Sequence, residues 1–477
     1  MPGAFPSHVA DCGQGGSRYS RNPRPSLSRG REPISRPARA NRQTIEEQHL
    51  QLRRPAVTRV VVTGLGVRAP GGSGVKEFWS LLSEGRTATR GITFFDSSPF
   101  RSRVAGEVDF DGAAEGLTPQ ELRRMDRATQ FAVVCAREAL ADSGLPLEAH
   151  APERRGVVLG SAVAAATSLE NEYLVLSDSG RDWLVDPAHL SPYMGDYLSP
   201  GVAPAEVAWT AGAEGPVIMV SDGCTSGLDA VGYGVQLIQE GSADVVVAGA
   251  TDTPITPIVV ACFDAIKATT PRNDEPALAS RPFDATRNGF VLAEGAAMFV
   301  LESHASARAR GAHVYAEIGG YATRCNAYHM TGLKKDGREM AEAIRVALDQ
   351  ARLNPTDIDY VNAHGSGTKQ NDRHETAAFK TSLGRHAYDV PVSSIKSMIG
   401  HSLGAIGSLE IAASLLAIEN DTVPPTANLH HPDPECDLDY VPLTAREQPT
   451  NAVLTVGSGF GGFQSAMVLH RPEVTAV

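Results

Sequence analysis

Hydrophobic positions follow two patterns along most of the chain, and each pattern predicts a different element. Runs of consecutive apolar residues, as at 59–67 and 243–250, are typical of strands buried on both faces. Elsewhere apolar residues recur every three or four positions, as at 228–238, which predicts helices with one buried face. Their alternation predicts an α/β fold. Further strands are expected at 156–160, 217–220, 315–321, 358–363, 390–395, 452–456 and 463–469, and further helices at 76–84, 119–142, 337–353, 371–383 and 404–418.

These elements form two successive sets of similar size, although no sequence similarity between the sets is visible. We therefore expect an internally duplicated fold, with an N-terminal half at 57–308 and a C-terminal half at 309–472. Residues 161–215 break the pattern, because prolines and glycines are frequent there and aromatic residues are scattered among them. We expect an irregular insertion at 161–215.

Residues 1–56 differ in composition from the rest of the chain. Arginine, proline, serine and glycine are frequent, acidic residues are few, and apolar periodicity is absent. A segment of this composition buries too little apolar surface to fold alone, and it lacks the apolar core of a secretory signal. We expect a disordered basic extension at 1–56, which is either a tail of the native protein or the product of an upstream start codon.

Bulk composition excludes several classes of protein. The net charge of −12 disfavours nucleic acid as a partner. The sequence contains no run of 18 or more apolar residues, which argues against a membrane span. The six cysteines are scattered and form no CxxC pair, which indicates a reducing cytoplasm and no structural metal.

One cysteine stands where a nucleophile is expected. The segment VIMVSDGCTSG at 217–227 places Cys224 between a short strand and an amphipathic helix. Backbone N–H groups and the positive end of a helix dipole favour the thiolate at such a turn. Cys224 is therefore a candidate nucleophile.

Three later segments also run from a strand into glycine. They are NAHGSGT at 362–368 with His364, SIKSMIGHS at 394–402 with Lys396 and His401, and GSGFGGF at 457–463. In α/β enzymes, strand ends of this kind are where active sites are built. Two histidines, a lysine and a glycine-rich loop at strand ends thus predict a site that is shared with Cys224.

Through these segments the chain resembles a family, the β-ketoacyl-acyl-carrier-protein synthases of the thiolase fold. Within the family it most resembles the ketosynthase α-subunit of bacterial type II (aromatic) polyketide synthases. The resemblance covers about residues 58–472. It rests on VTGLGVRAPGG (62–72), GCTSGLDAVGYGVQLIQEG (223–241), NAHGSGTKQNDRHETAAFK (362–380), SSIKSMIGHSLGAIGSLE (393–410) and GSGFGGFQSAM (457–467).

The resemblance implies a five-layered α/β/α/β/α fold and decarboxylative condensation of malonyl units onto a cysteine-bound acyl chain. It implies that Cys224 is the nucleophile, and that its backbone N–H and that of Ser458 form the oxyanion hole. His364 and His401 would stabilise the enolate. Lys396, paired with Glu410, would act electrostatically rather than as a base. In the NDRHET segment, Asp372 and Glu375 are either dipole-favouring residues of a helix start or members of the active-site network.

Two departures from the family pattern stand out. Ser458 occupies the place where fatty-acid enzymes usually carry a gating phenylalanine, which fits the polyketide branch. Asp222 stands where threonine is more common, and would raise the pKa of the thiol if it pointed inward.

The resemblance also implies partners. A chain-length-factor subunit would complete a heterodimer, and acyl carrier protein would deliver substrates on phosphopantetheine, with no resident cofactor or metal. Arg123, Arg124 and Arg127 form a candidate docking patch for the acidic carrier.

Three alternatives remain. The first is a homodimeric fatty-acid-elongating synthase, against which Ser458 and the 368–380 segment weigh. A thiolase would carry a second catalytic cysteine in the glycine-rich loop at 457–462, which has none. An inactive chain-length factor would lack Cys224.

Overall fold

The computed structural model describes residues 58–182 and 187–472, so the expected extension at 1–56 lies outside the described residues. A mixed sheet of 11 strands organises this part of the chain. Its strands are β1 (Val60–Ala69), β2 (Gly72–Ser73), β5 (Arg155–Gly160), β6 (Val217–Val220), β7 (Val245–Asp252), β9 (Gly295–Ser303), β10 (Ala316–Cys325), β11 (Tyr360–Asn362), β12 (Val392–Ser393), β15 (Ala452–Ser458) and β16 (Phe463–His470).

The order of these strands reveals a repeat. The first five major strands lie in the order β6-β5-β7-β9-β1, and the last five in the order β12-β11-β15-β16-β10. In the first set β5 is parallel to β6 and β7, and β9 is antiparallel to β7 and β1. In the second set β11 is parallel to β12 and β15, and β16 is antiparallel to β15 and β10. The duplicated fold is therefore confirmed. The boundary between residues 308 and 309 stays a prediction.

Helices fill the space between the repeats and cover their outer faces. They are α2 (Val75–Ser83), α3 (Pro119–Arg124), α4 (Arg127–Ser143), α5 (Ala166–Leu176), α6 (Met194–Leu198), α7 (Val202–Ala211), α8 (Ser226–Gln239), α9 (Pro257–Ala265), α10 (His304–Ala309), α11 (Arg338–Ala351), α12 (Lys369–Leu383), α13 (Lys396–Ile399) and α14 (Ile406–Asn420). Two small sheets join β3 (Arg90–Gly91), β4 (Val104–Gly106) and β8 (Leu292–Ala293), and β13 (Thr422–Val423) and β14 (Arg446–Glu447).

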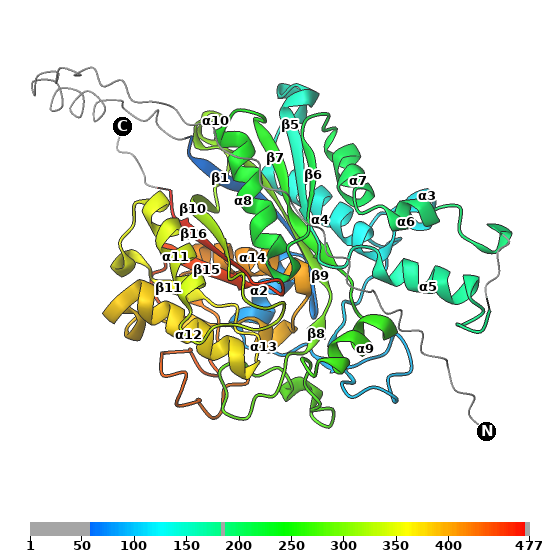
Figure 1. Ribbon diagram of the computed structural model, residues 1–477. Helices are drawn as coiled ribbons and strands as arrows, with labels where there is room; N and C mark the ends of the chain where they lie inside the picture. Colours follow the sequence, from blue (N-terminus) through cyan, green and yellow to red (C-terminus); the bar gives the residue numbers. More distant parts are fainter. Residues whose placement is uncertain (1–57, 183–186, 473–477) are drawn as a thin grey trace, which may run out of the picture. The chain divides into compact units, whose positions relative to one another are not determined.

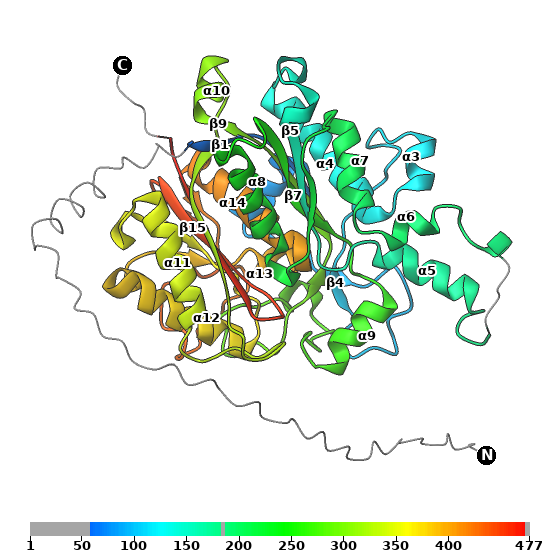
Figure 2. The ribbon, with the colours of Figure 1, turned by 45° about the horizontal axis from the view of Figure 1, so that its top comes forward.

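Figures 1 and 2 show the layers. Helices α8 and α14 pack on each other and contact strands of both repeats, while α4 and α7 lie on one outer side and α11 and α12 on the other. This is the expected five-layered α/β/α/β/α arrangement. The segment Leu403–Asn420 is apolar and long enough to cross a membrane, but 89% of it is buried within the fold, as expected for a core helix.

Two expectations about elements were wrong. The helix expected at 119–142 is interrupted, because Asp126 accepts hydrogen bonds from the N–H groups of Ala128 and Thr129 and so caps a new helix, α4. The insertion at 161–215 is not irregular throughout, since it holds α5, α6 and α7. Helices form there although α6 contains Gly195 and α7 contains Pro204 in its first turn, where proline is tolerated.

Candidate active site

Cys224 lies on a tight elbow between β6 and α8. Gly223 has a φ of 60°, a left-handed conformation that glycine adopts without strain. The Ser226 hydroxyl accepts the N–H of Asp222 at 2.9 Å and donates to the carbonyl of Gly223 at 2.7 Å. These bonds fix the elbow, so the thiol stands at the start of the helix as the sequence predicts.

A pocket of about 540 Å³ brings the predicted side chains together. Cys224, His364, His401 and Ser458 all line it, although the first three come from separate loops and Ser458 from the end of β15. The loops follow β6, β11 and β12 and leave β15, so the pocket forms at the carboxyl ends of parallel strands. Its wall is completed by Phe263, Ala268, Phe290, Thr331, Leu333, Ser366, Thr368, Gln370, Asn371, Leu403, Gly459 and Phe460.

His364 is held by groups on both its backbone and its ring. Glu375, on α12, accepts the backbone N–H of His364 at 2.5 Å and that of Gly365 at 2.8 Å. The ammonium of Lys396 donates to the carbonyl of His364, and lies 3.4 Å from its Nδ1. Because an ammonium has no acceptor, Nδ1 must be the unprotonated nitrogen, and the ring proton is on Nε2.

His401 reaches the same tautomer by a different contact. The backbone N–H of Leu403 donates to Nδ1 of His401 at 3.2 Å, which again leaves the proton on Nε2. The ring centroids of His364 and His401 are 5.2 Å apart, and the two ring planes meet at an angle of 81°. Phe290 packs edge-on against His401. Two Nε2–H donors therefore line one pocket.

Both imidazoles are neutral. Burial, together with the positive charge of Lys396, lowers the pKa of His364 and of His401 well below the ordinary value. A neutral imidazole donates a single hydrogen bond, so the pair is suited to stabilising a developing negative charge.

Lys396 forms a fully buried ion pair with Glu410 of α14. Burial raises the pKa of Glu410 to about 7, and the ammonium of Lys396 opposes this effect. Lys396 lies behind His364 rather than on the pocket wall. The pair that the resemblance implies is present, and its position fits an electrostatic role.

The resting thiol is protonated. Burial raises the pKa of Cys224 to about 12, while the charge of Lys396 and the backbone N–H of Phe460 act in the opposite direction. The sequence-based expectation that the turn favours the thiolate omits this burial. Asp222 is only half-buried, and is not among the main influences on the thiol.

The backbone donor that faces the sulfur is that of Phe460, not Ser458. The backbone N–H of Phe460 acts on the thiol of Cys224 and lowers its pKa, against the effect of burial. Ser458 is the last residue of β15, where it pairs with Gln464 of β16, and its hydroxyl accepts from the amide of Gln464 at 3.0 Å. Phe460 is therefore better placed than Ser458 to act as an oxyanion donor, because Ser458 still belongs to the strand ladder; the oxyanion hole itself stays a prediction.

The NDRHET segment joins the site from behind. Glu375 holds the His364 loop, and burial raises its pKa to about 8. Asp372 accepts from Gly367 N–H at 3.2 Å and forms a buried ion pair with Arg287 at 2.8 Å. Sequence reasoning missed Arg287, because no motif surrounds it. Among the described residues, no cluster of His, Cys, Asp or Glu is arranged to hold a metal ion.

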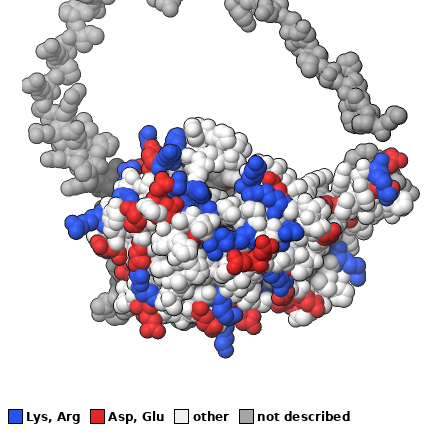
Figure 3. Space-filling view, turned by 90° about the horizontal axis from the view of Figure 1, so that it is seen from below, with Lys and Arg blue, Asp and Glu red and all other residues white. Residues whose placement is uncertain are grey.

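The expected basic patch is largely neutralised. Arg124 pairs with Glu206 at 2.6 Å, and Arg127 pairs with the buried Glu294 at 2.7 Å; only Arg123 of the three is fully on the surface. Figure 3 shows basic and acidic side chains interspersed over the face that is seen from below. Arg124 and Arg127 thus form ion pairs within the fold and are only partly exposed, which weakens the case for a three-arginine docking patch; the patch itself stays a prediction.

Comparison with known proteins agrees with this geometry. The β-ketoacyl synthase N-terminal domain matches residues 57–307, and the β-ketoacyl synthase C-terminal domain matches residues 315–430. A granaticin polyketide putative β-ketoacyl synthase 1 from Streptomyces violaceoruber is 81% identical over 418 residues, which cover 88% of this chain and 99% of that protein.

Two solved structures are also similar. One is a type II polyketide synthase acyl-carrier protein in complex with its ketosynthase bound to the hexaketide (TM-score 0.82, 38% identity, 87% of this chain and 100% of that chain). The other is the ishigamide ketosynthase/chain length factor (TM-score 0.80, 34% identity, 87% and 100%). The chain belongs to the β-ketoacyl synthase family and has its thiolase-like fold.

Proposed function

We propose that the chain is the ketosynthase α-subunit of a type II aromatic polyketide synthase. It is an acyltransferase that extends a cysteine-bound acyl chain with malonyl units carried on acyl carrier protein. The observation that carries the proposal is a single pocket lined by the thiol of Cys224 and by His364 and His401, both Nε2–H donors. The high identity to a granaticin synthase supports the polyketide branch.

Acyl transfer comes first in the proposed cycle. The sulfur of Cys224 attacks the thioester carbonyl, its proton leaves with the carrier thiol, and an acyl-cysteine remains. The N–H groups of Cys224 and Phe460 stabilise the tetrahedral oxyanion between them. The effect of the Phe460 N–H on the pKa of the Cys224 thiol supports this assignment, since it marks a backbone donor beside the reacting atom.

Decarboxylation follows in the same pocket. The bond between the malonyl α-carbon and its carboxylate breaks, carbon dioxide leaves, and the electron pair forms an enolate on the thioester. His364 and His401 donate from Nε2 to the enolate oxygen, and Lys396 with Glu410 sets the electrostatic potential behind them. The α-carbon then attacks the acyl-cysteine carbonyl, the bond from that carbonyl to the sulfur of Cys224 breaks, and the departing thiolate takes a proton from solvent to restore the thiol.

A partner subunit fits the edge of the sheet. Strand β6 is the last strand in the sheet order, and the apolar side chains of Val217 and Ile218 are exposed on it. An exposed apolar edge strand is a template for pairing with another chain. We propose that a chain-length factor covers this edge. The similar ishigamide ketosynthase/chain length factor supports a partner of this kind, and the exposed apolar edge supports its position.

The remaining partners follow from the reaction. Acyl carrier protein delivers both substrates on phosphopantetheine, so the cycle uses no resident cofactor or metal, no nucleic acid and no membrane. We place the protein in the cytoplasm, where the carrier and malonyl substrates are made. These assignments rest on the chemistry of the reaction and on the carrier complex of a related ketosynthase.

The test is product formation from malonyl-loaded carrier protein, with and without a co-expressed chain-length factor, read by mass spectrometry. Poly-β-keto products that need the partner and vanish in Cys224→Ala support the proposal. Partner-independent extension of a saturated acyl chain by one two-carbon unit overturns it in favour of a fatty-acid-elongating homodimer.

A further inference from the structure

A buried carboxylate outside the expected site lies against the turn that follows His401. Asp252 ends β7 and is fully buried, and no basic side chain in the described part of the chain is within ion-pair distance of it. Its Oδ2 accepts the N–H of Gly404 at 2.7 Å and that of Ala162 at 2.8 Å. Its Oδ1 accepts the Ser161 hydroxyl at 2.5 Å and the N–H of Val163 at 3.2 Å.

The turn that Asp252 holds has an unusual backbone. Leu403 has a φ of 48°, in the left-handed region that a branched side chain rarely adopts. That conformation directs the N–H of Leu403 to Nδ1 of His401. A Cβ on the next residue, Gly404, would lie 2.6 Å from Oδ2 of Asp252. The carboxylate is therefore pressed against the segment that fixes the His401 tautomer.

We propose that Asp252 is a positioning residue for decarboxylation, because its carboxylate holds the Leu403–Gly404 turn that keeps His401 as an Nε2–H donor. This inference rests on the proposed function. Strained backbone persists where surrounding contacts fix it, and the bond to Gly404 N–H is such a contact. A carboxylate suits the position because all four groups that face it are donors, and an amide would turn its own N–H toward at least one of them.

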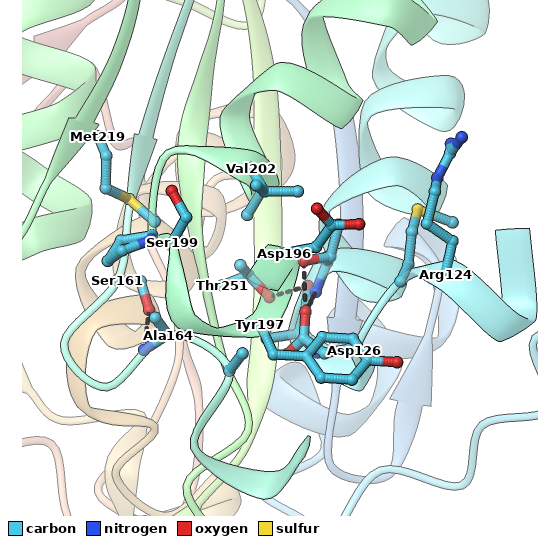
Figure 4. Close-up of a pocket in the computed structure, with 16 residues that line it drawn as sticks. Arg124, Asp126, Ser161, Ala164, Asp196, Tyr197, Ser199, Val202, Met219 and Thr251 are labelled. Atoms are coloured by element: carbon cyan, nitrogen blue, oxygen red, sulfur yellow. Dashed lines mark hydrogen bonds between the residues drawn. The ribbon is translucent and has the colours of Figure 1, made fainter. Parts of the chain in front are cut away.

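The same carboxylate ties the His401 turn to the other half of the molecule. Ala162 and Val163 pack in the apolar cluster that contains Leu403 and Cys224. Figure 4 shows Ser161, whose hydroxyl accepts the N–H of Ala164 at 2.9 Å, on the wall of a second pocket of about 420 Å³. Asp252 thus joins the loop beside the nucleophile to the loop that carries the histidine.

The test compares Asp252→Asn with the unchanged chain, each co-expressed with the chain-length factor. Imidazole 15N shifts in histidine-labelled protein report the tautomer of His401, with its signal assigned from a His401→Gln sample. We expect the variant to lose the single Nε2–H signature. We expect malonyl decarboxylation to fall about tenfold or more, while acyl transfer to Cys224 changes much less.

Asp126→Asn is the matched control. Asp126 is also a buried carboxylate that accepts backbone N–H groups, but it caps α4, and the hydrogen bonds of its side chain within the described residues go to Ala128 and Thr129 rather than to the His401 turn. We expect neither the His401 signal nor the ratio of the two rates to change in it. Ser161→Ala removes one of the four hydrogen bonds to Asp252. We expect it to change the His401 signal and the ratio of the two rates in the same direction as Asp252→Asn, but by less. It keeps the inference testable even where Asp252→Asn folds poorly.

The inference is overturned if His401 keeps its signature in folded Asp252→Asn, or if acyl transfer and decarboxylation fall equally, as a merely structural residue would produce. Failure of the proposed function looks different. In that case the unchanged chain neither decarboxylates malonyl carrier protein nor condenses it, while the His401 signal still responds to Asp252→Asn.

Discussion

The two repeats of the fold share one strand order but carry different chemistry. In the first repeat the loops after β5 and β6 bear Ser161 and Cys224, and the end of β7 bears Asp252. In the second, the loop after β11 bears His364, the one after β12 bears Lys396 and His401, and the one after β15 bears the glycine-rich turn. The repeats thus bring two sets of equivalent strand ends to a common pocket.

This difference in chemistry indicates that each repeat contributes its groups to a different step of the proposed reaction. The first repeat supplies the nucleophile, and the second supplies the neutral imidazoles and their buried ion pair. The two sets of groups are still coupled, because the positive charge of Lys396 on the second repeat acts on both. It lowers the pKa of the Cys224 thiol, and it lowers the pKa of His364 and His401 so that these imidazoles stay neutral.

Cys224→Ala should separate the contributions of the two repeats with the largest effect. We expect condensation to fall to background, because no other described thiol lines the pocket. Malonyl decarboxylation should persist, since the imidazoles belong to the other repeat. Mass spectrometry of the carrier would reveal acetyl-carrier protein without condensation products. Loss of decarboxylation as well would show that the repeats do not work separately.

The converse change is His364→Ala. Removing one enolate donor should slow decarboxylation by about 100- to 1,000-fold, a typical cost of deleting one oxyanion donor. Transfer of a labelled acyl group to Cys224 should be reduced far less. An equal fall in both rates would contradict the division of labour, and His313→Ala, at an exposed site, serves as the control.

A third prediction concerns stability and pH in the second repeat. Burial raises the pKa of Glu375 from 4.5 to about 8, so between these values the folded state holds a proton that the unfolded state has lost. This contribution to stability is complete below about pH 4.5, and is lost as the pH rises toward 8. In urea unfolding, the free energy of unfolding should fall more steeply from pH 5 to pH 8 for the unchanged chain than for Glu375→Gln. Parallel curves would reject the assignment.

The smallest expected effect is at the elbow of the first repeat. Ser226→Ala removes the two hydrogen bonds that fix Gly223 and Asp222, and should lower the free energy of unfolding by about 1–2 kcal/mol. Ser408→Ala, which removes one longer bond of 3.4 Å to Gly227, should cost less. Chemical denaturation measures both, and the reverse ranking would contradict the role given to Ser226.

The candidate site was predictable where residue type carries the chemistry. Cys224, His364 and His401 stand in glycine-flanked segments after strands, and all three line one pocket. Phe460 was missed because its contribution is a backbone N–H, which every residue but proline carries. Asp252 was missed because it ends an apolar strand with no motif around it, and its four donors come from distant positions along the chain.

The sequence by itself determined the elements and the chemical groups, because hydrophobic periodicity and glycine positions act locally. Those signals predicted most major strands and helices and the loops that bear Cys224 and the histidines, but they missed the central strand β9 and the helices α5, α7 and α9. Only the tertiary structure decided the identical strand order of the repeats, the burial that protonates Cys224, and the contacts that fix each imidazole tautomer. Those properties depend on distances between residues far apart in the chain, and such distances exist only once the layers have packed.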